Sequence, residues 1–391
     1  MSHSPASLSH RPRLRAVGLV TTSIFAAACI FTAACSSSPG GGQPSEEGCG
    51  LDPAEVEHGT SADCDSLCTP TNAALCDGAP HKVDCESLPP NAAFDACGVA
   101  LRHPTTAGVS LELKRSDNVK EYGGSGPPDL SCVTEGSYPD PPSSSSTATL
   151  SGLAKIFSHG CQSSELQIQV FTVKRTGGED DGEPDQLVGQ LVETAGDCSV
   201  DGVEEDVDDC DPRFECRYSY PNVPTETELL VITQGPKWSP IYEYGLYIRD
   251  ADLVDGVYEK DVRALATDDY GVLAQVAIGQ SINPGFGAVA GEVHDCGDVR
   301  IVNAVVDIDK PRSALTYFTD NEDNPLPDLS AKATSTLGLY AAMNVSPGAL
   351  RVSAAGITDG KLVGLGYIDL RVFPDAVTSF TFRGLKPYQV P

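Results

Sequence analysis

The sequence predicts a mainly β protein with two tandem β-sandwiches, preceded by a small cysteine-rich module and an export signal. Three observations predict this organisation. The 391 residues exceed the length of one ordinary domain, and 40% hydrophobic with 21% charged residues is the composition of a folded chain. Apolar and polar residues alternate in several runs after residue 150. One motif also occurs twice in that region, which indicates internal duplication.

Residues 1–34 have the pattern of an export signal. The basic stretch RPRLR precedes the apolar run AVGLVTTSIFAAACIFTAAC, which ends in two alanines and Cys35. This run resembles a bacterial lipoprotein signal, which implies cleavage before Cys35 and acylation of its thiol. Cys29 is an alternative acylation site, and an uncleaved membrane helix is an alternative to the signal. Ser36 is similar to the second residue of signals sorted to the outer membrane, and residues 35–48 form a predicted flexible tether.

Fourteen cysteines with no CxxC pair predict disulfides formed in an oxidising compartment. Residues 49–149 are expected to form a cysteine-rich module followed by a linker rich in proline and serine. This module has few large apolar side chains, so disulfides are expected to stabilise it, although the sequence does not assign their pairing. A zinc site is the alternative there, but two-residue spacing of thiolates is missing. With Cys35 acylated, the cysteines expected in disulfides are Cys49, Cys64, Cys68, Cys76, Cys85, Cys97, Cys132, Cys161, Cys198, Cys210, Cys216 and Cys296.

Residues 150–266 and 287–391 are predicted to be the two β-sandwiches. Period-two alternation predicts strands in LQIQVFTV (166–173), ELLVIT (228–233), VRIVNAVVDI (299–308), LRVSA (350–354) and VTSFTF (377–382). Residues 267–286 form a predicted helical linker, in which TDDYGVLAQVAIGQ reads as a short helix capped by Asp268. Its expected apolar face comprises Leu273, Val276 and Ala277, and Gly279 stands near its end.

The two predicted β units align with each other. SGLAKI (151–156) corresponds to AGEVHD (290–295), so Gly152 corresponds to Gly291. At an offset of 122 positions (340 minus 218), three residues of the first unit recur in the second. These are Tyr218, Asn222 and Val223, matched by Tyr340, Asn344 and Val345.

The second unit carries the clearest motif, TSTLGLYAAMNVSPGALRVSA (334–354). Thr334, the turn residue Gly338, Tyr340 and the Pro347-Gly348 turn together resemble the carboxypeptidase regulatory-like domain. The resemblance implies a transthyretin-like, or immunoglobulin-like, β-sandwich that carries no catalytic residues. In the first unit Cys216 stands where Gly338 stands in the second, so the resemblance is weaker there.

The charge of the chain excludes nucleic acid as an expected partner. With 26 basic and 55 acidic residues the formal net charge is −29, whereas phosphate binding needs clustered cations. Fourteen of the acids lie between Glu179 and Asp211, a segment without lysine or arginine. We expect a solvated acidic insertion here, with calcium binding as the alternative hypothesis. The calcium candidates are Asp180, Asp181, Asp206, Asp208, Asp209 and Asp211.

The sequence has no catalytic motif such as HExxH or GxSxG, and we predict a non-catalytic protein without a cofactor. The prediction is an acyl-anchored scaffold or binding protein of the outer membrane, facing the periplasm or the exterior, with an envelope protein or polysaccharide as partner. One alternative is a hydrolase whose site lies in the cysteine-rich module or between domains. The other is a carbohydrate-binding module centred on Trp238, the one tryptophan, near Tyr242, Tyr244 and Tyr247.

Overall fold

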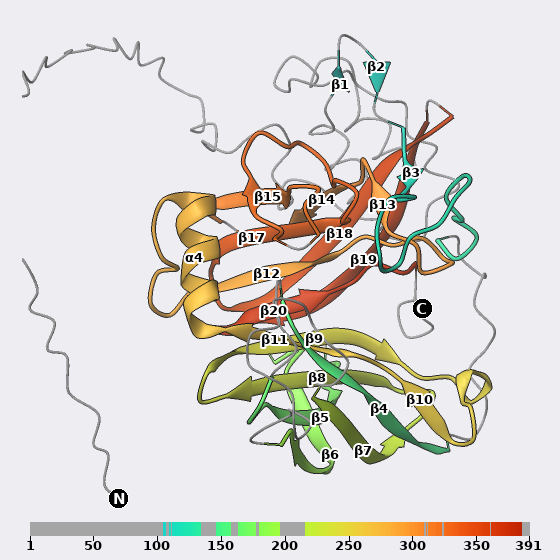
Figure 1. Ribbon diagram of the computed structural model, residues 1–391, viewed down its shortest axis with the longest axis vertical. Helices are drawn as coiled ribbons and strands as arrows, with labels where there is room; N and C mark the ends of the chain where they lie inside the picture. Colours follow the sequence, from blue (N-terminus) through green and yellow to red (C-terminus); the bar gives the residue numbers. More distant parts are fainter. Residues whose placement is uncertain are drawn as a thin grey trace, which may run out of the picture. The chain divides into compact units, whose positions relative to one another are not determined.

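The computed structural model describes residues 105–106, 109–110, 112–133, 146–157, 163–176, 180–195 and 216–384, apart from residues 309, 311, 323 and 360. Within these residues the fold is mainly β, as predicted (Figure 1). Cys35 and the six cysteines between positions 49 and 97 lie outside the described residues. No helix in the described part of the chain has the length and apolar character that crossing a bilayer requires.

The first β unit consists of two sheets. Its strands are β4 (Thr147–Ile156), β5 (Gln167–Val173), β6 (Pro184–Glu193), β7 (Arg217–Pro224), β8 (Glu228–Gly235), β9 (Trp238–Tyr247), β10 (Val257–Glu259) and β11 (Val262–Ala266). In one sheet β4 is antiparallel to β7 and parallel to β10 and then β11, and the end of β11 pairs with β9, which joins this sheet to the other along one edge. The other sheet has the antiparallel order β6-β5-β8-β9. Buried side chains from both sheets, including Leu150, Ile168 and Val231, form the core between them.

The second β unit also consists of two sheets. Its strands are β12 (Gly287–Glu292), β13 (Ile301–Val302), β14 (Val305–Ile308), β15 (Ala314–Phe318), β16 (Pro327–Asp328), β17 (Leu339–Val345), β18 (Gly348–Thr358), β19 (Lys361–Val372) and β20 (Val377–Phe380). One sheet has the order β20-β12-β17-β15-β16 and the other the order β14-β18-β19. The short pieces outside the two units are β1 (Thr105–Thr106), β2 (Val109–Ser110), β3 (Lys114–Arg115) and the 3-10 turn η4 (Asp250–Asp252).

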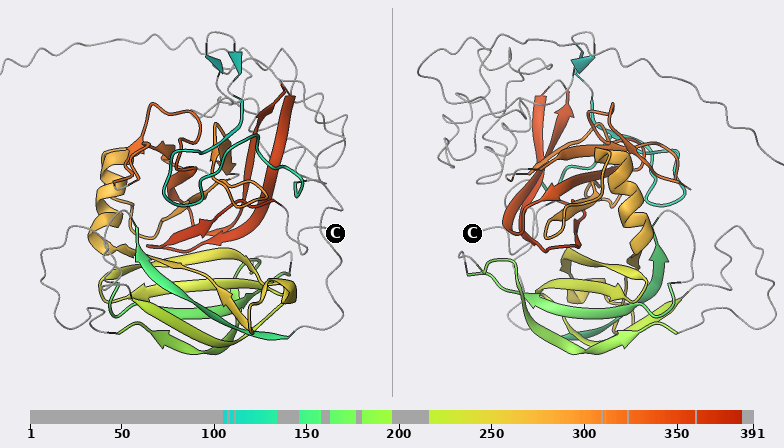
Figure 2. Two further views of the ribbon diagram at one scale, coloured as in Figure 1. Left: turned by 45° about the vertical axis from the view of Figure 1, so that its right-hand side comes forward. Right: turned by 90° about the vertical axis from the view of Figure 1, so that its left-hand side faces the viewer.

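Strand β20 joins the two units into one continuous sheet. It runs parallel to β12 on one side and parallel to β9 of the first unit on the other. The result is the strand order β6-β5-β8-β9-β20-β12-β17-β15-β16 across both units (Figures 1 and 2). Tandem sandwiches were predicted, but a shared sheet was not.

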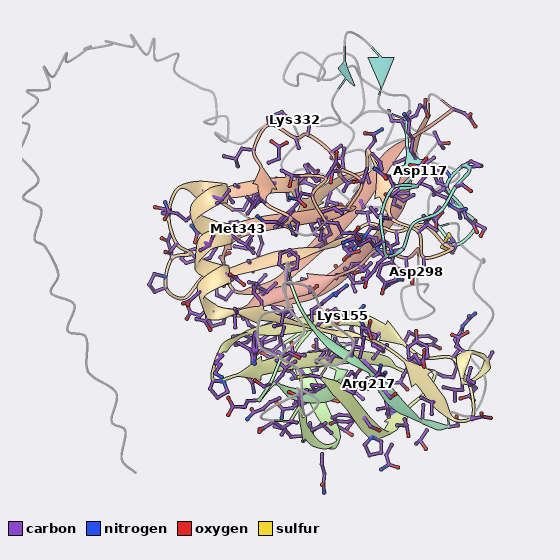
Figure 3. All side chains as sticks on the ribbon, viewed as in Figure 1. Asp117, Lys155, Arg217, Asp298, Lys332 and Met343 are labelled. Atoms are coloured by element: carbon purple, nitrogen blue, oxygen red, sulfur yellow. A yellow bond between two sulfur atoms is a disulfide. The ribbon has the colours of Figure 1, made fainter. Side chains whose placement is uncertain are left out.

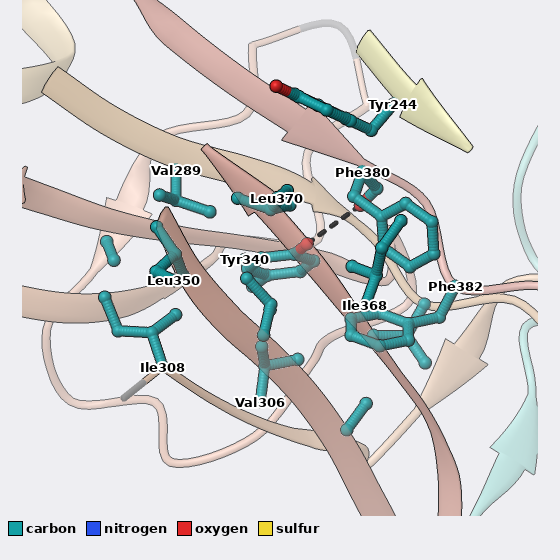
Figure 4. Packing of buried hydrophobic residues seen from close by; sticks show 14 of the residues in the cluster. Tyr244, Val289, Val306, Ile308, Tyr340, Leu350, Ile368, Leu370, Phe380 and Phe382 are labelled. Atoms are coloured by element: carbon teal, nitrogen blue, oxygen red, sulfur yellow. Dashed lines mark hydrogen bonds between the residues drawn. The ribbon is translucent and has the colours of Figure 1, made fainter. Parts of the chain in front are cut away.

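The continuous sheet is buried on both faces where it passes from one unit to the other. On β8, Leu229 and Val231 pack in the core of the first unit, whereas Leu230 and Ile232 pack with the second. The core of the second unit gathers large side chains from β14, β18 and β19 against the shared sheet, with Tyr340 hydrogen-bonded to Phe380 at its centre (Figure 4). Burial on both faces explains why ELLVIT is an unbroken apolar run.

Corresponding residues hold corresponding positions in the two units, which supports the predicted duplication. Gly152 on β4 pairs with Tyr218 on β7, and Gly291 on β12 pairs with Tyr340 on β17. Beside each glycine a backbone carbonyl occupies the space that a Cβ would need, that of Lys260 in the first unit and that of Phe380 in the second. The matched tyrosine donates its hydroxyl hydrogen to that same carbonyl in each unit.

The two matched asparagines also share the same backbone conformation. Asn222 has φ 62° and Asn344 has φ 55°, both in the left-handed region that asparagine tolerates better than most residues. The two units differ in the pairing of one strand: β6 of the first unit pairs with β5, whereas β15 of the second unit pairs with β17. The resemblance to a transthyretin-like motif placed turns at Gly338 and Gly348, and both residues have positive φ.

The predicted helix is present as α4 (Thr267–Ile278), between β11 and β12. It ends at Gly279, which has φ 68° and donates its N–H to the carbonyl of Gln275. Two details of the prediction are wrong. The cap is Ala266 rather than Asp268, which lies inside the first turn, and Val276 is exposed while Ala274 and Ala277 face the sheet.

Residues 112–133, here called the strap, pack on the second β unit although the sequence groups them with the N-terminal module. Strand β3 pairs with β13, and Leu113 is buried against Gly356. A disulfide joins Cys132 to Cys296, 164 positions further along the chain. Cys216 is also disulfide-bonded. The strap therefore belongs structurally to the second unit.

Candidate functional site

A cleft lies between the two β units, on the face of the shared sheet that α4 partly covers. Its floor is the outer face of β20, β12 and β17, where alternate residues point away from the core that holds Tyr340. Several of these floor residues are small, notably Ala288, Ala290 and Ala341. The alanines leave a chamber of about 140 Å³ between the sheet and the elements above it.

The walls of the chamber are mainly apolar. Tyr270 and Leu273 come from α4, Leu265 comes from β11, and Phe157 follows the end of β4. The ring of Phe157 meets the ring of Phe318 edge to face, with centroids 6.3 Å apart. Met343 on β17 closes the side next to α4 (Figure 3). The chamber therefore presents hydrocarbon from both β units and from the helix that links them.

A larger polar cavity of about 380 Å³, here called the vestibule, adjoins the chamber. The two spaces share six lining residues, namely Tyr122, Glu243, Lys260, Asp261, Thr381 and Arg383. The vestibule adds two further acids, Glu259 and Asp298, and three further tyrosines, Tyr244, Tyr247 and Tyr258. The two adjoining spaces thus differ in character, because the chamber is mainly apolar and the vestibule is polar and lined by tyrosines.

Ion pairs surround the cleft, and those of Glu121 link the strap to the first unit. Glu121 of the strap accepts from Lys155 on β4 at 2.6 Å and pairs with Arg263 on β11 at 3.3 Å. Lys155 also pairs with Asp261 at 2.8 Å, and Lys260 pairs with Glu243. Burial alone raises the pKa of Asp261, but hydrogen bonds from Lys155 and from the Leu153 N–H outweigh it and lower that pKa. Figure 3 shows Lys155 and Asp298 near this junction.

His294 is buried between two carboxylates beside the cleft. Its Nε2 lies 2.7 Å from Glu292 and its Nδ1 lies 2.7 Å from Asp298. Arg300 donates to Glu292 at 3.0 Å, and Arg383 pairs with Asp298. The Tyr122 ring of the strap packs on the imidazole, with centroids 5.0 Å apart.

This cluster keeps its carboxylates ionised. Burial opposes ionisation of Glu292, but hydrogen bonding and charge from His294 and Arg300 hold its pKa well below its usual range. At Asp298 burial again opposes ionisation, but His294 and Arg383 outweigh it and lower the pKa to about 2. Together with Asp261, these cleft acids are proton acceptors at neutral pH rather than donors.

The groups around His294 are held by hydrogen bonds and ion pairs with one another. His294 is the one histidine within the described residues, and both its ring nitrogens are bonded to carboxylates rather than to a hydroxyl or thiol nucleophile. No group of three or more His, Cys, Asp or Glu side chains in the described ranges is placed to hold a metal ion. What the cleft offers a ligand is apolar surface at one end and fixed charges and hydroxyls at the other.

The carbohydrate-binding hypothesis centred on Trp238 is wrong. The indole is only 7% exposed, packs in the core of the first unit and donates its N–H to the carbonyl of Ser164 at 2.9 Å. It therefore has no free face on which a sugar could stack. Tyr242 stacks on Phe373 with centroids 3.8 Å apart, whereas Tyr244 and Tyr247 line the vestibule.

Two of the six calcium candidates are described, and both are bonded to basic side chains. Asp180 accepts from Lys174 at 2.5 Å, and Asp181 pairs with Arg175 at 3.3 Å. The other four candidates, Asp206, Asp208, Asp209 and Asp211, lie outside the described residues.

The residues that form the cleft were not predicted from the sequence. They come from strands and loops far apart in the chain, so no local motif contains them. One signal was present in AVAGEVHD, where Ala288 and Ala290 precede Glu292 on the same face of β12, so that this face carries two small residues and then an acid. Small residues in a buried strand often mark the close approach of another group.

No family model matches the chain, and no curated protein matches it. Three solved structures resemble parts of it at low TM-scores. The shaft pilin SpaA of Lactobacillus rhamnosus GG has 9% identity and a TM-score of 0.20, over 62% of this chain and 100% of the pilin. The minor pilin of Streptococcus agalactiae has 10% identity and a TM-score of 0.17, over 60% and 94%. The major pilin of Streptococcus pyogenes has 9% identity and a TM-score of 0.15, over 61% and 100%. Similarity at this level does not bear on what the chain binds.

Proposed function

We propose that the protein is an exported, lipid-anchored and non-catalytic binding protein, whose ligand occupies the cleft between the β units. One observation carries this proposal. An apolar chamber of about 140 Å³ adjoins a polar vestibule of about 380 Å³, and residues of both units line the two spaces. Concave sites of mixed lining at the junction of two structural units are where small molecules commonly bind.

The framework around the cleft supports binding without rearrangement. Both units contribute strands to one sheet, and Glu121 ties the strap to Lys155 and Arg263 of the first unit. A site already held in its bound shape loses little conformational freedom when the ligand enters. The cleft is therefore preorganised.

Anchorage is the second part of the proposal and rests on the sequence. The signal-like segment ending at Cys35 supports acylation, and the tether to residue 48 would let the β units stand away from an outer membrane. The disulfide between Cys132 and Cys296 is compatible with an oxidising compartment. The resemblance to carboxypeptidase regulatory-like domains supports a role that does not require catalysis.

The cleft is tested by filling its chamber. Ala290→Phe places a ring in the chamber, and Ala349→Phe is a matched control, because Ala349 is exposed on β18. We expect 2-phenylethanol at millimolar concentration to raise the melting temperature of the wild type and the Ala349→Phe variant by a few degrees, but not that of Ala290→Phe. Equal responses from all three proteins, or none from the wild type, would overturn the assignment of the cleft as a binding site.

A further inference from the structure

We infer that the ligand of the cleft is a small aromatic cation, with one ring for the chamber and an ammonium or guanidinium group for the vestibule. This inference rests on the proposed function and names the chemistry of the molecule bound. It follows from three properties of the described residues: the volume of the chamber, the balance of charge in the vestibule, and the tyrosines that line it.

The volume of the chamber limits the apolar group to about one ring. Its volume is about 140 Å³. An engineered apolar cavity of about 150 Å³ in another protein stays dry and holds benzene, so a space of this size accepts a single six-membered ring. Phe157, Leu273 and Met343 supply hydrocarbon contacts on different sides of such a ring.

The charge balance of the vestibule favours a cation. Four carboxylates line it, those of Glu243, Glu259, Asp261 and Asp298, against the two basic groups of Lys260 and Arg383. Lys260 neutralises Glu243 and Arg383 neutralises Asp298, while Lys155 approaches Asp261 from outside the vestibule. Glu259, exposed on β10, has no ion-pair partner within the described residues. An ammonium group entering the vestibule would therefore meet an uncompensated carboxylate.

The vestibule tyrosines and the net charge act in the same direction. Burial raises the pKa of Tyr122 and of Tyr258, so both phenols are neutral, and phenol oxygens can accept hydrogen bonds from an ammonium group. The chain carries a formal charge of −29, which raises the local concentration of cations and lowers that of anions. An aromatic carboxylate of the same size would lose both contributions.

Three probes of nearly equal size separate charge from shape: 2-phenylethylammonium, neutral 2-phenylethanol and 3-phenylpropionate. At low ionic strength we expect calorimetry to give the ammonium probe several-fold tighter binding than the alcohol and more than tenfold tighter binding than the carboxylate. Added salt at 0.5 M should narrow these ratios, because it screens the exposed carboxylate. Binding of the carboxylate as tight as that of the ammonium probe would overturn the inference.

Two conservative variants test whether Glu259 causes the preference for the ammonium probe over the alcohol. Glu259→Gln should reduce the affinity for the ammonium probe about threefold and leave the affinity for the alcohol unchanged, as expected for loss of one partly exposed charge. Glu193→Gln is the matched control, because Glu193 is exposed on β6, at the edge of the shared sheet away from the cleft. An unchanged ammonium-to-alcohol ratio in Glu259→Gln would contradict the role of Glu259. If the alcohol also fails to bind the wild type, the proposed function fails, whereas binding of the alcohol without a charge preference overturns only this inference.

Discussion

The hydroxyl of Tyr340 donates a hydrogen bond of 2.8 Å to the carbonyl oxygen of Phe380, inside the core of the second β unit (Figure 4). That carbonyl also lies 1.8 Å from the position where a Cβ on Gly291 would stand. Three strands, β12, β17 and β20, thus meet at one point. The same contact recurs in the first unit, where Tyr218 donates to Lys260 at 2.6 Å beside Gly152.

Gly291→Ala should destabilise the fold strongly. The added methyl group would overlap a backbone carbonyl that cannot move without shifting β20, so we expect a loss of about 3 kcal/mol or more in the free energy of unfolding by urea. Gly271→Ala is the matched control, since nothing lies within 4 Å of its Cβ position and it stands inside α4. That control should gain about 0.5–1 kcal/mol from helix propensity. Equal effects of the two substitutions would contradict this account of the contact.

Acid should weaken the protein through the cluster around His294. The pKa of Asp298 is about 2 in the folded chain against an ordinary 3.8, and that of Glu292 is also lowered. The unfolded chain therefore binds more protons, so the stabilisation is present above about pH 5 and is lost as the pH falls towards about 2. Asp298→Asn should unfold more easily than the wild type at pH 7 and approach it at pH 2. Asp185→Asn, which changes an exposed acid on β6, should keep the wild-type dependence. A constant difference between wild type and Asp298→Asn across this range would contradict the prediction.

Removal of the disulfide between strap and second unit should lower stability. The double variant Cys132→Ser, Cys296→Ser opens a link that spans 164 positions, and we expect a loss of about 2–4 kcal/mol in urea unfolding. Because this disulfide holds the end of the strap on the second unit, limited proteolysis within residues 112–133 should also become faster. Unchanged stability together with unchanged cleavage would show that the other contacts of the strap suffice.

Substitution of Cys35 tests the anchor. Cys35→Ser should move the protein from the membrane fraction to the soluble fraction, whereas Cys29→Ser should leave it with the membrane. Intact mass of the membrane-extracted protein should show acyl chains in the wild type only when Cys35 is present. Release by Cys29→Ser instead would move the acylation site to Cys29, and retention of both variants would favour an uncleaved helix.

The sequence was informative where structure depends on neighbouring residues. Alternation located β5 and β18, the apolar run ELLVIT coincides with β8, and the matched tyrosines and asparagines hold corresponding positions in the two units. VRIVNAVVDI was predicted as one strand but forms β13 and β14, separated at Asn303, whose φ is 69°. Alternation alone did not reveal that β20 pairs with both β9 and β12, because the partner of a strand is set by contacts distant in sequence.

The site was less accessible to sequence reasoning than the fold. A lone tryptophan among tyrosines suggested a carbohydrate-binding site at Trp238, but this residue packs in the core. The neighbouring Tyr244 and Tyr247 line the vestibule instead. Glu121 meets Lys155 and Arg263 at the cleft, although more than a hundred positions separate Arg263 from the other two residues. Ion pairs of this kind depend on how the two units are joined, and that joining depends on β20.

The position of β20 has a consequence for the order of folding. Val377–Phe380 is the last described strand in the chain, yet β9 of the first unit and β12 of the second each need it as a neighbour. Tandem units usually mature one after the other as a chain emerges. The sheet that spans both units is incomplete until this late strand pairs, so we expect the two units to reach their final shape together rather than one after the other.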